Sequence, residues 1–573
     1  MSGQIVNRVS KSRKTKKRLG KLTPCQLYNL PAIFKRSEAG NTPGGFDKYF
    51  FGANFLPYFA AFFTKSNHMS PFTKNLAFIV ACFSFLRIAA QDKPADTTVG
   101  KPQKSVTHHS IKIDGKIINY TATAGTLLLK NEKDESIALF GYTAYTKEGE
   151  TDLAKRPVTF SYNGGPGSAS MWLHMGVVGP RRIVVNDPNF NAPPPYKLED
   201  NNYSILDVTD IVMIDPVGTG FSQATGKAKN KDFWGVDQDC KSVSQFIKQY
   251  ITDNDRWNSP KYLLGESYGT MRSAAVVNYL QQNMGMAMNG VVLVSNVLDL
   301  RSLTFKQGDD ISYMFYIPSF AAVAWYHNKL PNKPANLESF LKEVRQFASG
   351  EYAAALVNGD LLSAADKDHI IEKLYNYTGI SKEYWKKADL RVNLFQFNQE
   401  LLRSDHQTVG RLDSRYKGYT QDLLGEFAAY DPQDAAISPP FVAAFMNYYF
   451  TELKFPKNSN YKVSAGENEG FDWDWNHAKN KGWGPSPTNT AVDLAEAMTQ
   501  NPNLKILVLN GYFDLATPFF ATEYTFDHMG LEPALKANIK LTYYEAGHMM
   551  YVHEPSAKAF KKDVGEFISS TSK

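Results

Sequence analysis

Six short and almost unbroken apolar segments most constrain the fold of this chain. They read VTFSY (158–162), DIVMID (210–215), KYLLG (261–265), GVVLVSN (290–296), KILVLNG (505–511) and KLTYYEA (540–546). Strands without a polar face are typical of a parallel sheet that is buried on both sides. Longer segments separate them, and one of these, 237–251, carries apolar residues at helical spacing. The sequence therefore predicts an α/β fold with a mostly parallel central sheet and helices on both faces.

Two other regions show different patterns. Residues 105–146 alternate between polar and apolar positions, which predicts antiparallel strands. Residues 301–490 lack such apolar strands and instead show helical patterns, at 336–348, 362–376 and 437–453. We interpret 301–490 as a largely helical cap inserted between two parts of the core, 105–300 and 491–573, with an independent domain as the alternative. A cap at this place would cover the carboxyl ends of the strands, where open α/β sheets bind ligands.

The net charge of +6 is concentrated at the start of the chain. Residues 1–90 hold 14 lysines and arginines and 2 acidic residues, whereas residues 91–573 hold 49 and 55. The acidic balance of the body argues against a nucleic-acid partner, because phosphate backbones are bound by clustered Lys and Arg. Our hypothesis is that Met69 is the true start and that the basic leader 1–68 comes from an over-extended reading frame.

Residues 69–90 have the three parts of a secretory signal peptide. Lys74 supplies a short positive region, 76–86 supply an apolar run of 11 residues, and Ile88 and Ala90 fit the cleavage site before Gln91. A retained membrane anchor is the alternative, although 11 residues are short for spanning a bilayer. We expect an exported protein, periplasmic or secreted, with a flexible mature N-terminus over 91–104.

Cysteine usage agrees with a fold that depends on its core alone. Of Cys25, Cys82 and Cys240, only Cys240 remains in a chain that starts near Gln91, so we expect no internal disulfide. No Cys/His cluster has the spacing of a metal site, and we expect neither a metal nor a cofactor. The two aspartates and the histidine of FDWDWNH (471–477) offer a metal site as an alternative, but we favour an aromatic packing loop.

The pentapeptide GESYG (265–269) lies between a predicted strand and a helix predicted at 270–281. In a G-x-S-x-G turn, small flanking residues let the backbone lift the serine hydroxyl, here that of Ser267, above the sheet. A serine nucleophile needs a base that is oriented by an acid. Asp514 and His548 follow the last two apolar strands in the order that an α/β-hydrolase triad requires. This order and position predict a catalytic triad, and other histidines such as His174 lack such a strand-end position.

The glycine-rich stretch SYNGGPGSAS (161–170) follows the first apolar strand. Such a turn holds either a phosphate or an oxyanion. The phosphate-loop pattern G-x-x-x-x-G-K-[ST] is absent from the sequence, which favours the oxyanion. An α/β-hydrolase takes one donor from the residue after the nucleophile and one from an earlier strand-to-helix loop. The predicted donors are therefore the N–H of Tyr268 and an N–H of the glycine pair Gly164-Gly165.

Six motifs occur in a fixed order: NGGPGS (163–168), GP (179–180), DPVGTGFS (215–222), GESYG (265–269), NGYFDLATP (510–518) and AGHMMY (546–551). On these residues the chain resembles the serine carboxypeptidase family of α/β-hydrolases, the group of carboxypeptidase Y and cathepsin A, from about Ser105 to the C-terminus. It is similar to a bacterial-type member without disulfides. The resemblance implies a triad of Ser267, Asp514 and His548, with Gly165 and Tyr268 as oxyanion donors and a helical cap.

The resemblance also implies a network that holds the substrate's terminal carboxylate. The matching positions are Asn163, Gly164 and Glu266, and a carboxylate beside Glu266 requires a shared proton. This chain departs from the family where a tryptophan is replaced by Ser161 and a second glutamate by Val177. Half of the implied carboxylate network is thereby missing.

We therefore predict an exported serine carboxypeptidase that cleaves C-terminal peptide bonds through an acyl-enzyme. The rival reading is an esterase or acyltransferase that uses the same triad, and a catalytically silent binding protein is a third. The expected partner is a peptide substrate. We expect no nucleic acid and no stable membrane partner unless the signal is retained, and the oligomeric state is open, with a homodimer among the options.

Overall fold

The computed structural model describes residues 99–457, 460–480, 482 and 486–572. The basic leader 1–68, the predicted signal peptide 69–90 and the first part of the predicted flexible N-terminus, 91–98, lie outside these residues. Among the residues described, no helix is both long and apolar enough to cross a membrane.

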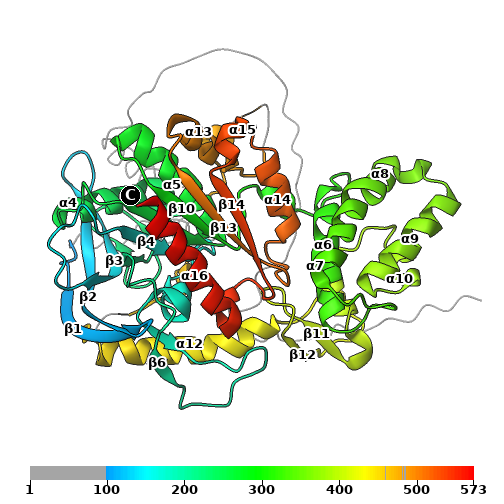
Figure 1. Cartoon of the computed structure of the whole chain (residues 1–573), viewed down its shortest axis with the longest axis horizontal. Coiled ribbons are helices and arrows are strands. Elements are labelled where there is room, and N and C mark those ends of the chain that lie inside the picture. The colour runs from blue at the N-terminus through cyan, green and yellow to red at the C-terminus, as the bar shows by residue number, and fades with distance from the viewer. Residues whose placement is uncertain (1–98, 458–459, 481, 483–485, 573) are drawn as a thin grey trace, which may run out of the picture. The chain divides into compact units, whose positions relative to one another are not determined.

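A ten-stranded mixed sheet forms the centre of the fold (Figure 1). An antiparallel meander begins it, made of β1 (Lys104–Ile113), β2 (Lys116–Lys130) and β3 (Ser136–Lys147), and the short β8 (Gln223–Ala224) pairs with β3. The six apolar segments form the parallel strands β4 (Val158–Tyr162), β7 (Asp210–Ile214), β9 (Lys261–Glu266), β10 (Gly290–Val294), β13 (Lys505–Gly511) and β14 (Ile539–Tyr544). Their order is β7-β4-β9-β10-β13-β14, with β7 antiparallel to β3. The predicted fold class is confirmed, and the topology is that of an α/β-hydrolase.

Both faces of the sheet are buried, as the unbroken apolar strands predict. In β10, Val291 and Leu293 belong to one core cluster, and Val292 and Val294 belong to another. Successive side chains of a strand point to opposite faces, so each cluster fills one side of the sheet. The first cluster packs beneath α4 (Val236–Asp253), α5 (Tyr268–Met284) and α13 (Ala491–Gln500). The second packs beneath α12 (Pro432–Thr451) and α16 (Glu554–Thr571).

The segment between β10 and β13 is mostly helical and has two parts. The first part comprises α6 (Ile311–Tyr326), α7 (Leu337–Phe347), α8 (Ala353–Asn358), α9 (Ala364–Thr378), α10 (Lys382–Lys387) and α11 (Leu394–Glu400). These helices pack around one core cluster, which also includes Phe513 and Leu515 from the segment after β13. Figure 1 shows α6 to α10 grouped together. The second part is α12, whose Phe441 and Phe445 pack in the cluster on the sheet. A hairpin of β11 (Gln407–Val409) and β12 (Lys417–Tyr419) joins the two parts.

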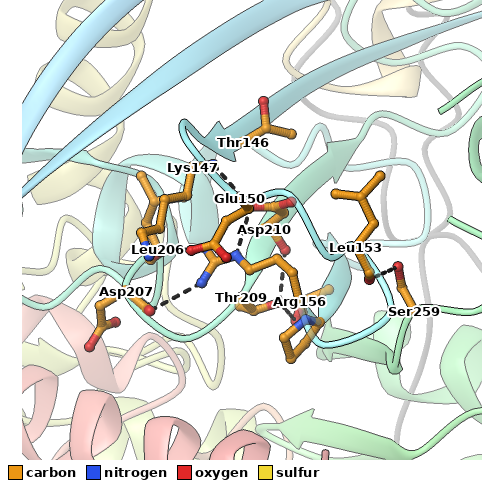
Figure 2. A network of polar contacts seen from close by, with 12 residues as sticks. Thr146, Lys147, Glu150, Leu153, Arg156, Leu206, Asp207, Thr209, Asp210 and Ser259 are labelled. Atoms are coloured by element: carbon orange, nitrogen blue, oxygen red, sulfur yellow. Dashed lines mark hydrogen bonds and ion pairs between the residues drawn. The ribbon is translucent and has the colours of Figure 1, made fainter. Parts of the chain in front are cut away.

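A buried ion-pair network ties the start of β7 to the loops that precede β4 and β9 (Figure 2). Asp210 Oδ1 accepts hydrogen bonds from Arg156 Nε at 3.0 Å and the Lys147 backbone N–H at 3.0 Å. Asp210 Oδ2 accepts from Arg256 Nη1 at 2.6 Å. Arg156 also donates to the carbonyl of Leu206 at 2.6 Å. All three charged side chains are almost fully buried, so one carboxylate balances two cations that water does not reach.

Replacing Asp210 should therefore cost more than breaking an exposed pair. The Asp210→Asn variant would leave Arg156 and Arg256 buried without a counter-charge, and we expect the free energy of unfolding to fall by about 3–5 kcal/mol. Guanidinium denaturation at neutral pH measures this change. The control is Glu150→Gln, which removes the partly exposed Lys147–Glu150 pair and should cost about 0–1 kcal/mol. Equal losses in the two variants would contradict the role given to Asp210.

Candidate active site

Ser267 occupies a sharp turn between β9 and α5. Its backbone has φ 60° and ψ −129°, a conformation that residues with a side chain rarely adopt. The flanking glycines make the turn possible, because a Cβ on Gly265 would lie 2.2 Å from the carbonyl oxygen of Gly269. The Ser267 N–H donates to the carbonyl of Val294 on the neighbouring strand at 3.0 Å. The predicted strand–turn–helix context of GESYG is thus present in the structure.

Asp514 and His548 meet at the ends of β13 and β14. His548 Nδ1 and Asp514 Oδ2 lie 2.7 Å apart, and both side chains are buried. Three further donors hold the carboxylate: the N–H groups of Ala516 at 2.7 Å and Thr517 at 2.9 Å, and the Thr517 hydroxyl at 2.7 Å. An aspartate with its oxygens occupied in this way can orient an imidazole without moving.

Electrostatics at His548 favour its role as a base. Burial alone disfavours the imidazolium, but the charge and the hydrogen bond of Asp514 outweigh burial and raise the pKa of His548 above its usual value. Stabilisation of the imidazolium is what a general base needs when it takes a proton from a weak acid such as serine.

Ser267 and His548 line one pocket, with a volume of about 240 Å³. Four other predicted site residues also line it: Asn163, Gly164, Gly165 and Glu266. The other two predicted site residues, Asp514 and Tyr268, do not line the pocket but adjoin residues that do. Asp514 is hydrogen-bonded to His548, and Tyr268 follows Ser267 in the chain. Residues that the sequence did not single out complete the lining: Trp172, Arg411, Leu412, Asp434, Ile437 and Met549, together with Ser168.

The glycine-rich loop packs directly on the Ser267 turn. A Cβ on Gly164 would lie 2.4 Å from the Tyr268 nitrogen, so only glycine allows this approach. Gly165 has φ 104°, which also favours glycine. The two segments that carry the expected oxyanion donors, Gly165 and Tyr268, are therefore in contact.

Two tryptophans of the FDWDWNH loop pack against the ring of Tyr268. Trp473 and Trp475 pack edge-on against the Tyr268 ring, with centroids 5.2 and 5.9 Å away, as the favoured packing interpretation predicts. His477 lies between two carboxylates, with Asp237 at 2.6 Å and Asp493 at 2.7 Å. Within the described part of the chain, no group of three or more His, Cys, Asp or Glu residues is arranged to hold a metal.

Glu266 is buried next to Ser267, the predicted nucleophile, and its pKa is raised. Burial raises its pKa to about 7, although the charge of His548 and a hydrogen bond from Tyr551 both lower it. The Tyr551 hydroxyl donates to Glu266 Oε2 at 2.7 Å. Asn163 is held in turn by the Leu173 N–H, which donates to its Oδ1 at 2.9 Å. Tyr551 lies in the quoted AGHMMY motif, but sequence reasoning gave it no role.

The two departures from the family pattern do not contact the pocket. Ser161 and Val177 are fully buried and are not among its lining residues. Ser168, the last residue of the NGGPGS motif, does line the pocket and accepts a hydrogen bond from Trp172 Nε1 at 3.1 Å. Histidine His174, a rival for the base, is buried elsewhere against the Tyr145 hydroxyl at 2.6 Å, and burial lowers its pKa to about 3.

Comparison with known proteins agrees with the motifs. A family model described as serine carboxypeptidase matches residues 116–557. The chain is 27% identical over 184 residues to the pheromone-processing carboxypeptidase KEX1 of Yarrowia lipolytica, which is 32% of this chain and 27% of that protein. It is 32% identical over 120 residues to a carboxypeptidase Y homolog of Arthroderma benhamiae, which is 21% of this chain and 22% of that protein.

These alignments span well under a third of the length of the curated relatives. The crystal structure of Kex1(delta)p, a prohormone-processing carboxypeptidase from Saccharomyces cerevisiae, superposes with a TM-score of 0.48 at 14% identity, covering 83% of this chain and 92% of that chain. The family match, by contrast, runs from β2 to α16 through every parallel strand of the sheet. On this match, the chain belongs to the serine carboxypeptidase family.

Proposed function

We propose that this protein is a serine-type carboxypeptidase that releases C-terminal residues from peptides through an acyl-enzyme. The observation that carries the proposal is the convergence of three groups: Ser267 on its strained turn, His548 anchored by Asp514, and Glu266, a buried acid with a raised pKa. The first two supply the chemistry of a serine hydrolase. The third supplies a means to bind a free carboxylate.

In the proposed reaction, His548 takes the proton of the Ser267 hydroxyl as the oxygen attacks the last peptide carbonyl. The N–H groups of Gly165 and Tyr268 stabilise the resulting oxyanion. His548 then gives its proton to the nitrogen of the departing amino acid, and the acyl group stays on Ser267. Water, activated by His548 in the same way, hydrolyses this ester and restores the serine.

Glu266, with Asn163 and Gly164, forms the proposed site for the terminal carboxylate. Two carboxylates at hydrogen-bond distance cannot both be ionised, so one proton must lie between them. Because burial places the pKa of Glu266 at about 7, it can hold this proton in weakly acidic solution. A neutral Glu266 would donate to the substrate instead of repelling it.

Substitution of the nucleophile tests the chemistry. Ser267→Ala should lower kcat by about 10⁶-fold without changing the fold, because the base then has no hydroxyl to activate. Mass spectrometry of peptide mixtures measures the release of C-terminal residues, and circular dichroism checks the fold. The wild type, but not the variant, should react with a serine-directed fluorophosphonate. Retained turnover in the variant would refute the assignment, and an unlabelled wild type would support a silent binding protein.

The same assay separates the peptidase from the esterase or acyltransferase. The wild type should cleave a blocked dipeptide with a free carboxylate in strong preference to its C-terminal amide. Indifference to the carboxylate, together with fast cleavage of simple esters, would favour the rival function.

The titration of Glu266 predicts a pH dependence. Since Glu266 is protonated below pH 7 and ionised above it, kcat/KM for free-carboxylate substrates should fall about tenfold per pH unit above this pKa. Glu266→Gln keeps a hydrogen-bond donor that does not titrate, so the alkaline fall should disappear. Tyr551→Phe removes a bond that lowers the pKa of Glu266 and should move the fall to higher pH. An unchanged alkaline limb in Glu266→Gln would contradict this role.

We also propose that the protein is exported, to the periplasm or outside the cell, on the strength of the pattern at 69–90. After expression of the full reading frame in an export-competent host, N-terminal sequencing of the mature protein should find a start near Gln91. A mature protein that begins upstream of that position would count against a cleaved signal.

A further inference from the structure

We propose that Arg411 binds a carboxylate of the leaving amino acid. This inference rests on the proposed function and adds a residue that the family motifs quoted above do not contain. Arg411 would supply this ligand with a side chain that the family pattern does not include.

The backbone of Arg411 is fastened to the catalytic loops. Its carbonyl accepts from the Leu515 N–H at 3.0 Å, next to Asp514 in the chain. The carbonyl of the following residue, Leu412, accepts from the His548 N–H at 2.6 Å. Asp413 continues the connection, because its Oδ2 accepts from the Gly547 N–H at 3.0 Å. Arg411 is thus held close to both His548 and Asp514, and it lines the pocket.

Within the part of the chain that the structure describes, the guanidinium of Arg411 is not tied to another side chain by a hydrogen bond or a close ion pair, although its charge acts on the buried carboxyl of Asp431 and lowers the pKa that burial raises there. Across the described residues, none accepts a hydrogen bond from it or lies within 4.0 Å as an ion pair. Asp431 accepts its hydrogen bonds from the backbone N–H groups of Arg411, Leu412 and Gln433 and not from the guanidinium, which keeps its donors for another acceptor. Arg415, four residues on, shows the contrast: its guanidinium is buried between Asp413 and Asp187.

The position of Arg411 fits the leaving side of the pocket. His548 must protonate the departing amine, so the departing residue lies beside this histidine. Arg411, Leu412 and Met549 line the pocket near His548. Met549 follows His548 in the chain, the carbonyl of Leu412 accepts a hydrogen bond from the His548 N–H, and Arg411 precedes Leu412.

Arg411 also gives the pocket a charge that the other lining residues lack. The other titratable side chains that line the pocket are those of Glu266, His548 and Asp434. Asp434 is exposed and accepts a hydrogen bond from the Ser438 hydroxyl at 2.7 Å. Arg411 is therefore the one cation among these lining residues that does not depend on pH. A guanidinium matches a carboxylate with two parallel hydrogen bonds, which makes Arg the best suited side chain for this ligand.

Two carboxylates of the last residue could supply this chemistry: the terminal one, or an acidic side chain. Four blocked dipeptides distinguish them, ending in leucine, leucine amide, glutamate or glutamine. We would compare the wild type with Arg411→Gln, Arg411→Lys and the control Lys417→Gln, which removes an exposed cation of the same hairpin that does not line the pocket.

With a terminal-carboxylate contact, Arg411→Gln should raise KM about 10- to 100-fold for the three free acids and leave KM for the amide unchanged. With a side-chain contact, the loss should be confined to the peptide ending in glutamate. Arg411→Lys should recover part of either effect, and Lys417→Gln should match the wild type. An equal loss on all four substrates, or no loss on any, would overturn the proposal.

Binding without turnover provides a second measurement. In the Ser267→Ala background, calorimetry should show the same loss of affinity for the free acids when Arg411 is replaced, with the amide as reference. If the wild type released no C-terminal residue from any peptide, the proposed function itself would fail. If the wild type cleaved these peptides but replacement of Arg411 affected the free acids and the amide equally, only the role of Arg411 would be refuted.

Discussion

The strained backbone at Ser267 is the constraint on which the arrangement of the site depends. A side chain at φ 60° is held there only because the surroundings leave no alternative. Gly265 and Gly269 flank the turn, and Gly164 brings the next loop within contact of it. Four strands in parallel register then deliver the other groups to the same edge of the sheet, since β4, β9, β13 and β14 all end there. The position of the pocket therefore depends on both the order of the strands and the strained turn at Ser267.

The two carboxyl groups to which we assign roles, Asp514 as the acid of the triad and Glu266 as the carboxylate-binding acid, have different surroundings. Asp514 accepts hydrogen bonds from two backbone N–H groups and the Thr517 hydroxyl and pairs with His548. Glu266, only one residue from the nucleophile, is buried with few donors, and its pKa is raised to about 7. Two carboxylates of one site thus differ in the number of donors around each.

Much of this arrangement could be predicted from the sequence, because its signals are local. Apolar runs predicted the parallel strands, and motifs at strand ends predicted which residues would come together, including Ser267, Asp514 and His548. The roles of Tyr551 and Arg411 could not be predicted in this way. Tyr551 contacts Glu266 from 285 positions away, and Arg411 lies in an irregular stretch whose position depends on bonds to Leu515 and, through Leu412, to His548. The division of the helical insertion also escaped prediction, because the helical pattern of 437–453 does not reveal that its residues pack on the sheet.

The bonds between residues 411–413 and the catalytic loops have a consequence for how this family diversifies. An insertion that only packed against the sheet could be exchanged as one unit, and the exchange would change the substrate preference. Here the stretch that follows α11 is bonded to the loops that carry Asp514 and His548, and the core cluster of α6 to α11 also includes Phe513 and Leu515, on either side of Asp514. An exchange of the insertion would therefore have to keep both the bonds of residues 411–413 and the packing against Phe513 and Leu515, because otherwise Asp514 and His548 would lose their support.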